Sequence, residues 1–351
     1  MRTILIDGSQ GEGGGQMLRT SLALSMVTGQ PMVIENIRAR REKSGLLRQH
    51  LTAVEAAAKI CNADVEGATI GSKSLVFTPH AVNAGEYHFS VGTAGSATLV
   101  LQTILPALLT ATAPSRLVLE GGTHNPWAPP YPFLERVYLP LVQRMGPLVK
   151  ATLERPGFYP AGGGKMLVEV TPAKSLVGFD LLERGAVMRQ CAVAMVSNLA
   201  KSIALRELAK LQESLGWPRD VCHAEEVRAQ GPGNVIYTTI ESEHVTELFI
   251  GFGRLGASAR KVAEEVVSQV QHYLRAAVPV GPHLADQLLL LLALSAAGEP
   301  SDAQRGGRFR TTTLTPHSES QIAIFQHFLQ ISVDVHYDPS GQTCTVNVQP
   351  K

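Results

Sequence analysis

The chain of 351 residues lacks the features that define several common classes of protein. Its four cysteines, Cys61, Cys191, Cys222 and Cys344, form no C-x-x-C pair, and no set of Cys and His residues has the spacing of a zinc site. We therefore expect reduced thiols in the core of a cytosolic protein. No apolar run approaches the roughly 20 residues that span a bilayer. The longest, residues 288–294, has the length of a buried helix segment, so we expect no membrane association.

The chain also has almost no net charge and no recognisable secretory leader. Residues 1–7 enter a strand-like run directly, without an apolar h-region or a cleavage site, and we expect a cytoplasmic protein. Its 31 basic and 30 acidic residues give a net charge of +1. A protein that coats a long polyanion normally carries a global excess of positive charge. Any contact with nucleic acid is therefore expected to be local, such as the grasp of one end.

Strand-like and helical periods alternate in a pattern that recurs three times, over residues 4–78, 87–171 and 281–348. Such alternation is typical of an α/β (α+β) protein built from βαβαββ units. Residues 184–278 fit none of the copies and are interpreted as a small inserted α/β domain. Residues 1–183 and 279–351 would then form one large domain of three repeats.

Several predicted elements of this pattern bear on the candidate site. The predicted helices include residues 132–145, 199–215, 258–276, 284–297 and 318–330, and the predicted strands of the insert are residues 188–196 and 234–241. A turn is expected at residues 281–283, before the helix that carries Asp286. A strand that leads to His317 is expected at residues 308–314, and the loop expected before it, at residues 301–310, overlaps its start.

Two glycine-rich segments lack the spacing of the standard nucleotide-binding motifs. Residues 8–16 join a strand to a helix without a G-x-G-x-x-G pattern, although their backbone N–H groups can crowd around a phosphate. Glu12 suits such a phosphate-binding segment only if a divalent cation lies between its carboxylate and the phosphate, because the two negative charges repel each other. Otherwise Glu12 is a solvent-facing residue of a flexible turn. Residues 162–165 are not a Walker A loop, because position 159 is Tyr and Met166 replaces the Ser or Thr. We interpret them as a hairpin turn.

Four further features permit chemistry without establishing it. Basic residues cluster between Arg38 and Arg48, where a solvated loop is the alternative. Residues 123–130 are rich in proline and include Trp127, which suits either base stacking or a plain connection. Asp286 begins a helix, where an acid stabilises the helix dipole, orients an imidazole or helps to position a metal. His317 lies at a turn between a β-prone run and a helix, and is either a nucleophile or a capped surface histidine.

Taken in order, these segments resemble the RNA 3'-terminal phosphate cyclases over essentially the full chain, and most closely the bacterial members. The matching positions are residues 10–16, Arg38 and Arg41, residues 45–50, 99–106, 125–130, 157–164, 230–234 and 284–287, and His317 with the helix over residues 322–329. Most of these matches are weak alone, but their order and spacing are specific.

The resemblance implies an ATP-dependent enzyme that acts on RNA 3'-phosphate ends. In that family a histidine attacks the α-phosphorus of ATP, releases pyrophosphate and becomes histidine–AMP. AMP then passes to the RNA 3'-phosphate, giving RNA(3')pp(5')A, and the vicinal 2'-OH displaces AMP to form a 2',3'-cyclic phosphodiester. His317 matches the histidine, and a neutral imidazole is a suitable nucleophile near pH 7.

The resemblance also implies roles for nine other residues and a fold. Glu12 matches a glutamate associated with Mg²⁺ or Mn²⁺. Guanidinium groups suit phosphate oxygens and their transition-state charge. The implied phosphate-binding residues are Arg19, Arg38, Arg41 and Gln49, and the implied nucleotide pocket contains Gln102, Pro129, His283 and Asp286. The implied fold is three repeats that resemble the C-terminal domain of translation initiation factor three, with an inserted domain.

Two positions depart from the pattern of the family. His283 stands where related sequences have a tyrosine beside the adenine, which alters base stacking there. The loop over residues 301–310 is longer than usual and affects how an RNA end would enter.

Three other interpretations share part of the pattern. A non-catalytic relative that acts in ribosome assembly has the same fold, but the presence of both His317 and Glu12 argues against it. An enolpyruvate transferase has a related repeat architecture but needs no histidine–nucleotide intermediate. An RNA-binding module without activity is disfavoured by the near-neutral charge. Exposed sheet edges in the repeats are compatible with a homodimer.

Overall fold

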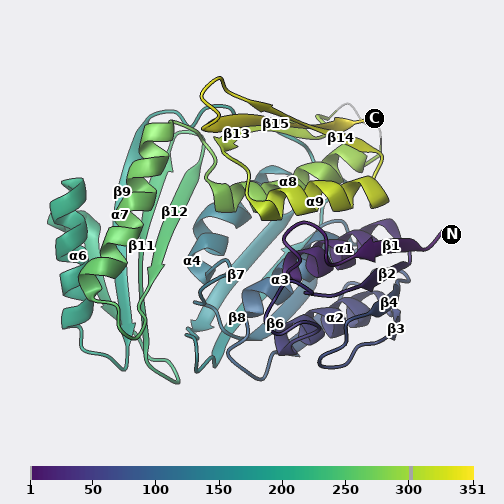
Figure 1. The fold of residues 1–351 in the computed structure, drawn as a ribbon, viewed down its shortest axis with the longest axis horizontal. Coiled ribbons are helices and arrows are strands. Elements are labelled where there is room, and N and C mark those ends of the chain that lie inside the picture. The colour runs from purple at the N-terminus through teal and green to yellow at the C-terminus, as the bar shows by residue number, and fades with distance from the viewer. Residues whose placement is uncertain (1, 300–302) are drawn as a thin grey trace.

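Four small sheets with helices packed on them form the computed structural model, which describes residues 2–299 and 303–351 (Figure 1). The α/β class expected from the sequence is confirmed. Within the described residues, no helix combines the length and the apolar character that crossing a membrane requires.

The first sheet contains the strand and the helix that flank the glycine-rich segment. Its elements are β1 (Ile4–Asp7), α1 (Gly15–Thr28), β2 (Met32–Glu35), α2 (Arg48–Cys61), β3 (Asp64–Glu66) and β4 (Leu75–Thr78). The strand order is β1-β2-β4-β3, with β1 parallel to β2 and the other pairs antiparallel. Ile4 and Ile6 are buried while Leu5 is 71% exposed, as the two-residue period of an edge strand predicts.

The second sheet has the same kind of order, β5-β6-β8-β7, with β5 parallel to β6. Its elements are β5 (Glu86–Ser90), α3 (Ala97–Leu108), β6 (Ser115–Gly121), α4 (Tyr131–Phe133), η1 (Leu134–Tyr138), α5 (Leu139–Arg144), β7 (Leu148–Arg155) and β8 (Gly164–Thr171). The single helix predicted over residues 132–145 is divided by η1, a π-helical turn. The hairpin interpretation of residues 162–165 is confirmed, because β7 and β8 pair antiparallel across that turn.

The third sheet has the order β13-β15-β14. Its elements are α8 (Pro282–Ala297), β13 (Gly307–Thr312), α9 (Pro316–Phe328), β14 (Ile331–Tyr337) and β15 (Thr343–Pro350). The turn predicted at residues 281–283 is wrong, because Pro282 supplies the first residue of α8. The strand predicted over residues 308–314 is present as β13, and the loop predicted over residues 301–310 is wrong from Gly307 onward, because residues 307–310 pair with β15. Residues 301 and 302 lie outside the described residues.

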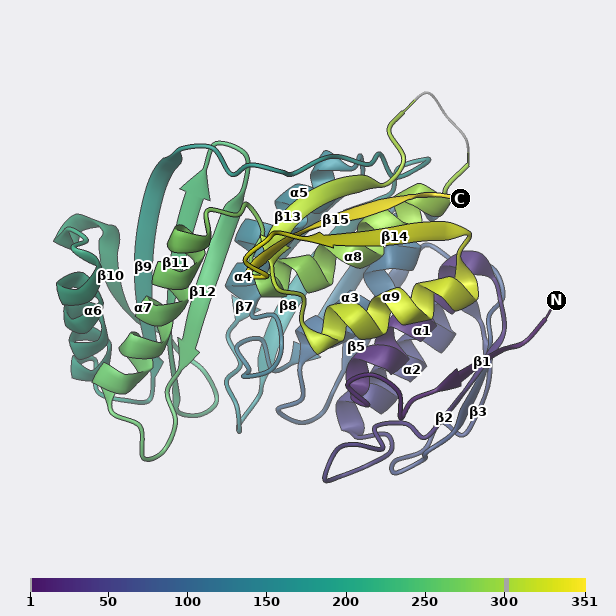
Figure 2. The same cartoon turned by 45° about the horizontal axis from the view of Figure 1, so that its top comes forward.

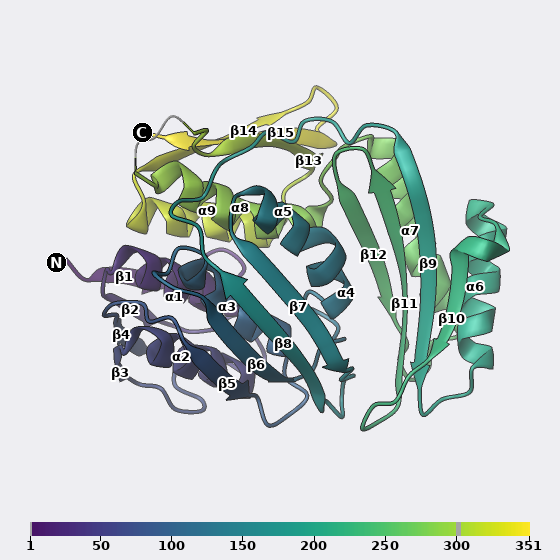
Figure 3. The same ribbon diagram turned by 180° about the vertical axis from the view of Figure 1, so that it is seen from behind.

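Residues between the second and third sheets form a fourth sheet, in the order β10-β9-β11-β12. Its elements are β9 (Val187–Ser197), α6 (Ser202–Leu215), η2 (Arg219–Val221), β10 (Cys222–Glu226), β11 (Gly233–Ser242), β12 (Thr246–Phe252) and α7 (Ala259–Ala276). Figures 1 and 3 show this sheet beyond β7 and β8, at the end of the molecule away from β1. It shares with α6 and α7 an apolar cluster separate from the main core.

The helices of the first three sheets pack against one another in the centre of the molecule (Figure 2). Helix α1 contacts both α3 and α9, and α9 also contacts α8. This packing brings the glycine-rich segment before α1 close to the first turn of α9. The candidate site lies at that meeting point.

Candidate active site

His317 lies in the first turn of α9, where the backbone is fixed by an N-cap. Thr315 is the N-cap residue, and its Oγ1 accepts the backbone N–H of His317 at 3.1 Å and that of Ser318 at 3.2 Å. The sequence placed His317 at a turn before the helix, whereas the helix starts at Pro316. The His317 side chain is 44% exposed, so it is accessible to a ligand while its backbone is held.

Glu12 brings a carboxylate to His317 from the loop between β1 and α1. Its Oε2 lies 2.9 Å from Nδ1 of His317 and 2.8 Å from Nη2 of Arg41. The ring N–H of His317 is not aligned for a hydrogen bond with Glu12, so the two side chains interact as an ion pair when the imidazole is protonated. The Glu12 side chain is only 6% exposed, and the interpretation of a solvent-facing residue is therefore wrong.

The close contact changes the protonation of both groups. The pKa of His317 is raised, chiefly by the nearby Glu12 carboxylate, whose effect outweighs that of burial. Burial acts to raise the pKa of Glu12, but His317 and Arg41 together hold it below its ordinary value. Glu12 is therefore ionised near neutral pH and stabilises positive charge on the imidazole.

The glycines of the loop allow it to lie against α9. Gly11 has a φ of +56°, and a Cβ at this position would collide with Oγ of Ser320 in α9. The same hydroxyl accepts the backbone N–H of Glu12 at 3.1 Å and donates to the Pro316 carbonyl at 2.7 Å. Ser320 thus ties the loop that carries Glu12 to the helix that carries His317.

Asp286 holds the first turn of α9 from the neighbouring helix α8. Its Oδ1 accepts hydrogen bonds from the hydroxyls of Thr315 and Ser318, both at 2.6 Å, and its backbone carbonyl accepts from Gln321 at 2.7 Å. Asp286 is 6% exposed, and burial raises its pKa while the two hydroxyls act in the opposite direction. Asp286 therefore orients the N-cap of the helix on which His317 lies.

The three arginines expected at the site are placed differently. Nη2 of Arg19 donates to Gln16 at 2.7 Å, while its buried Nε has no hydrogen-bond partner. Burial lowers the pKa of Arg19 to about 10, so it remains charged at neutral pH. Arg41 pairs with Glu12 and is half-exposed. Arg38 has a φ of +56°, and its Nη1 donates to the carbonyls of Lys43 and Gly45 within its own loop.

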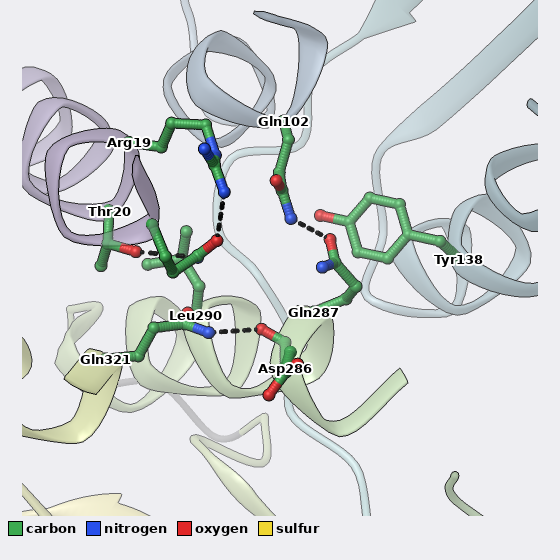
Figure 4. A pocket seen from close by; sticks show the side chains of 9 residues that line it. Arg19, Thr20, Gln102, Tyr138, Asp286, Gln287, Leu290 and Gln321 are labelled. Atoms are coloured by element: carbon green, nitrogen blue, oxygen red, sulfur yellow. Dashed lines mark hydrogen bonds between the residues drawn. The ribbon is translucent and has the colours of Figure 1, made fainter. Parts of the chain in front are cut away.

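A small polar cavity of about 10 Å³ lies beside this cluster (Figure 4). It has room for about one water. It is lined by Gln16, Arg19, Thr20, Gln102, Tyr138, Asp286, Gln287, Leu290 and Gln321. Nε2 of Gln102 donates to Oε1 of Gln287, and the buried Oε1 of Gln102 has no partner. Gln102 thus shares this cavity with Arg19 and Asp286, and its expected role in a nucleotide pocket stays a prediction.

The remaining three candidates lie outside the lining of the cavity. Gln49 in α2 accepts the backbone N–H of Ser96, the N-cap of α3, at 3.0 Å. His283 is exposed in the first turn of α8, and Pro129 is partly buried in the loop before α4. The roles expected for these residues stay predictions.

Sequence reasoning missed the hydroxyl groups and one histidine of the site. Thr315 and Pro316 end the β-prone run before His317, but a Thr followed by Pro is also a signal for the N-cap and first residue of a helix. His50 is buried, and its Nδ1 accepts the backbone N–H of Leu47 at 3.2 Å. Burial lowers the pKa of His50 to about 3, so it is neutral beside Arg19.

A metal ion at this site would need ligands beyond the protein. Among residues 2–299 and 303–351, no three His, Cys, Asp or Glu residues form a cluster that could hold a metal. Glu12 supplies a carboxylate whose Oε1 accepts one long bond, at 3.4 Å, from the Gln16 backbone. Mg²⁺ is commonly held by one or two carboxylates, with phosphate oxygens and water completing its shell. The donors present fit that arrangement, with Glu12 as the protein ligand.

Comparison with known proteins identifies relatives over nearly the whole chain. A family model described as RNA 3'-terminal phosphate cyclase matches residues 10–335. The chain is 50% identical to an RNA 3'-terminal phosphate cyclase of Koribacter versatilis, over 95% of this chain and 92% of the relative. Proteins of the same name from Ectopseudomonas mendocina and Ralstonia nicotianae are 47% and 46% identical. They are aligned over 94% and 98% of this chain, and over 94% and 97% of their own lengths.

Proposed function

Because the chain belongs to the RNA 3'-terminal phosphate cyclase family, we propose that it converts an RNA 3'-phosphate into a 2',3'-cyclic phosphodiester with ATP, through adenylylated His317. The observation that carries the proposal is the contact of His317 with Glu12 on a helix terminus that Asp286 holds. This arrangement leaves an accessible imidazole with a fixed orientation and a counter-charge.

The position of Glu12 selects the nitrogen that reacts. The negative charge of the Glu12 carboxylate, 2.9 Å from Nδ1, favours the tautomer with its proton on that atom even without an aligned hydrogen bond, and this tautomer leaves the lone pair on Nε2. Nε2 attacks the α-phosphorus of ATP, the bond from that phosphorus to the bridging oxygen breaks, and pyrophosphate leaves. The positive charge that develops on the ring lies beside ionised Glu12.

Two further displacements complete the reaction. An oxygen of the RNA 3'-phosphate attacks the same phosphorus, the P–N bond breaks, and its electron pair returns to Nε2 of His317. The product is RNA(3')pp(5')A. The vicinal 2'-OH then attacks the phosphorus of the RNA phosphate, loses its proton and expels AMP, which closes the cyclic phosphodiester.

The polar groups around His317 suit the charge of the phosphates. We assign Arg19 and Arg41 to phosphate oxygens, because Arg19 has an unpaired buried Nε and Arg41 lies within 2.8 Å of Glu12. Arg38 supports the loop that carries Arg41 through its bonds to carbonyl groups. Glu12 would hold Mg²⁺ or Mn²⁺, which would supply charge neutralisation on the phosphates when bound.

The nucleotide would lie along α3 and α8. We assign Gln102 and Asp286 to its pocket because both line the polar cavity. Gln49, Pro129 and His283 would form the outer part of the pocket, and His283 would lie beside the adenine.

We further propose that the first three sheets, in residues 1–183 and 279–351, are copies of one βαβαββ repeat like the C-terminal domain of translation initiation factor three. The strand orders support this. The first two sheets have matching orders, and in the third sheet an isolated parallel bridge between Val280 and Thr311 takes the place of the parallel β1–β2 pair. Residues 184–278 would be the inserted domain. We place the enzyme in the cytoplasm, in RNA processing or repair, and the exposed edge strand β1 is compatible with a homodimer.

The proposed function is tested on an RNA oligonucleotide that carries a 3'-phosphate and a 5' label. Incubation with the protein, ATP and Mg²⁺ is expected to make the 3' end resistant to phosphatase, because a cyclic diester has no terminal monoester. The same RNA without ATP, and with His317→Ala, should stay sensitive. An end that stays sensitive at stoichiometric concentrations of folded protein would contradict the proposal.

A further inference from the structure

The loop over residues 123–130 is fastened at both ends. The backbone N–H groups of Thr123 and His124 both donate to the carbonyl of Gly157 at 2.9 Å. Nδ2 of Asn125 donates to the carbonyl of Ala94 at 2.6 Å, and the N–H of Tyr131 donates to the carbonyl of Thr123 at 2.8 Å. The segment between these bonds is therefore held rigidly on the protein surface.

Trp127 stands out from this rigid loop into solvent. Its side chain is 92% exposed, and its backbone has a φ of +60°. A left-handed conformation costs a residue other than glycine about 1–2 kcal/mol. The other tryptophan, Trp217, is only 7% exposed and packs in the apolar cluster of α6 and α7. Folding gains nothing from an indole ring held in water on a strained backbone, which points to a ligand.

A chain of contacts connects the loop to the proposed active site. Asn125 is bonded to the segment before α3, where the N–H of Ser96 donates to Gln49. Gln49 precedes His50, which lies against Arg19 and Gly15 at the start of α1. On its other side the loop leads into α4 and η1, and η1 carries Tyr138 to the cavity of Figure 4. These contacts tie the loop to α1 and to η1, both of which line the cavity.

We propose that Trp127 stacks on a nucleobase at the 3' end of the RNA substrate, an inference that rests on the proposed function. Stacking on an aromatic ring suits an enzyme that acts on ends of many sequences, because every base has a π-face. The neighbours of Trp127 along the chain are Asn125, Pro126 and Ala128, which add no large apolar side chain to an apolar patch of the kind that a protein partner needs. Tyr159, 59% exposed on the neighbouring hairpin, adds a second flat ring.

The test separates the step that needs RNA from the step that does not. Trp127→Ala is expected to form protein–AMP from ATP at the rate of the unchanged protein, while its KM for the 3'-phosphate RNA rises about 10-fold or more. Trp127→Phe should retain part of the RNA affinity. Tyr337→Ala, which removes a half-exposed aromatic ring from β14, is the matched control and should change neither step.

Fluorescence supplies an independent readout, because Trp127 is exposed and Trp217 is buried. RNA with a 3'-phosphate is expected to quench the emission saturably in the unchanged protein and not in Trp127→Phe, while ATP alone should leave it unchanged. An unchanged KM for RNA in Trp127→Ala, or a raised KM for ATP, would overturn the assignment to an RNA base. Absence of protein–AMP in the unchanged protein would instead refute the proposed function. In that case, quenching of the Trp127 emission by RNA would still show whether Trp127 stacks on a base.

Discussion

Replacement of Asp286 by alanine tests whether α8 positions the reactive histidine. The change removes Oδ1, which accepts hydrogen bonds from the buried side chain of Ser318 and from Thr315, both at 2.6 Å. Hydrogen bonds to a charged group contribute about 1.5–3 kcal/mol each, and two bonds to one acceptor are not additive. We therefore expect the free energy of unfolding to fall by about 3 kcal/mol.

The effect on activity follows from the loss of the fixed N-cap. Thr315 caps the helix terminus that carries His317, and without Asp286 its hydroxyl is free to rotate. A displacement of about 1 Å at a reacting group can cost about 100-fold in rate. Asp286→Ala should therefore form protein–AMP about 100-fold more slowly at saturating ATP. Asp286→Asn keeps one acceptor oxygen and should lose less.

The assay is the rate of AMP transfer from labelled ATP to the folded protein, combined with denaturant unfolding of each variant. Glu319→Ala is the control, because Glu319 is an exposed acid in the same first turn of α9. A folded Asp286→Ala protein with a rate within about twofold of the unchanged protein would refute the positioning role.

Three further predictions address the loop, the imidazole and the inserted segment. Glu12→Gln removes the carboxylate that raises the pKa of His317. Because the neutral imidazole is the nucleophile, the acid limb of the pH–rate profile of adenylylation should move to lower pH, and the maximum rate should fall. An acid limb that does not move would contradict the assigned contact. Gly11→Ala and Gly29→Ala should each lower the free energy of unfolding by about 1 kcal/mol, because both positions have a positive φ. Only the Cβ at position 11 clashes with α9, so only Gly11→Ala should slow adenylylation. Equal adenylylation rates in the two variants would count against the role of the loop. Burial raises the pKa of Glu207 from 4.5 to about 7, so the free energy of unfolding should fall as pH rises between these two values. Glu207→Gln should flatten this fall, and an identical slope in the variant would show that Glu207 does not titrate there.

The order of strands and helices was largely predictable, because the spacing of apolar residues differs between a strand and a helix and can be identified in the sequence. The division of the helix over residues 132–145 was not predictable, since a π-helical turn keeps the apolar pattern. β10 and β12 escaped prediction in the insert. β10 carries the polar sequence Cys-His-Ala-Glu-Glu, and strands of this kind depend on their pairing partners more than on their own residues.

The site was predictable in its residue types and only partly in its contacts. Glu12 and His317 were named from the sequence, but their separation of 2.9 Å depends on Ser320 and Gly11 fitting together across the chain. Arg38 has a positive φ and its guanidinium donates to carbonyl groups of its own loop, contacts that the sequence did not indicate, and its expected role at a phosphate stays a prediction. Contacts between residues about 300 positions apart are a property of packing, and no local pattern records them.

The central claim, that His317 accepts AMP, is tested most directly by incubating the protein with α-labelled ATP and Mg²⁺ or Mn²⁺ and then denaturing it. The account predicts a labelled protein whose bond is acid-labile and alkali-stable, as a phosphoramidate on imidazole should be, and no label in folded His317→Ala. Peptide mapping should place the label at the start of α9. Label retained by His317→Ala would contradict the account.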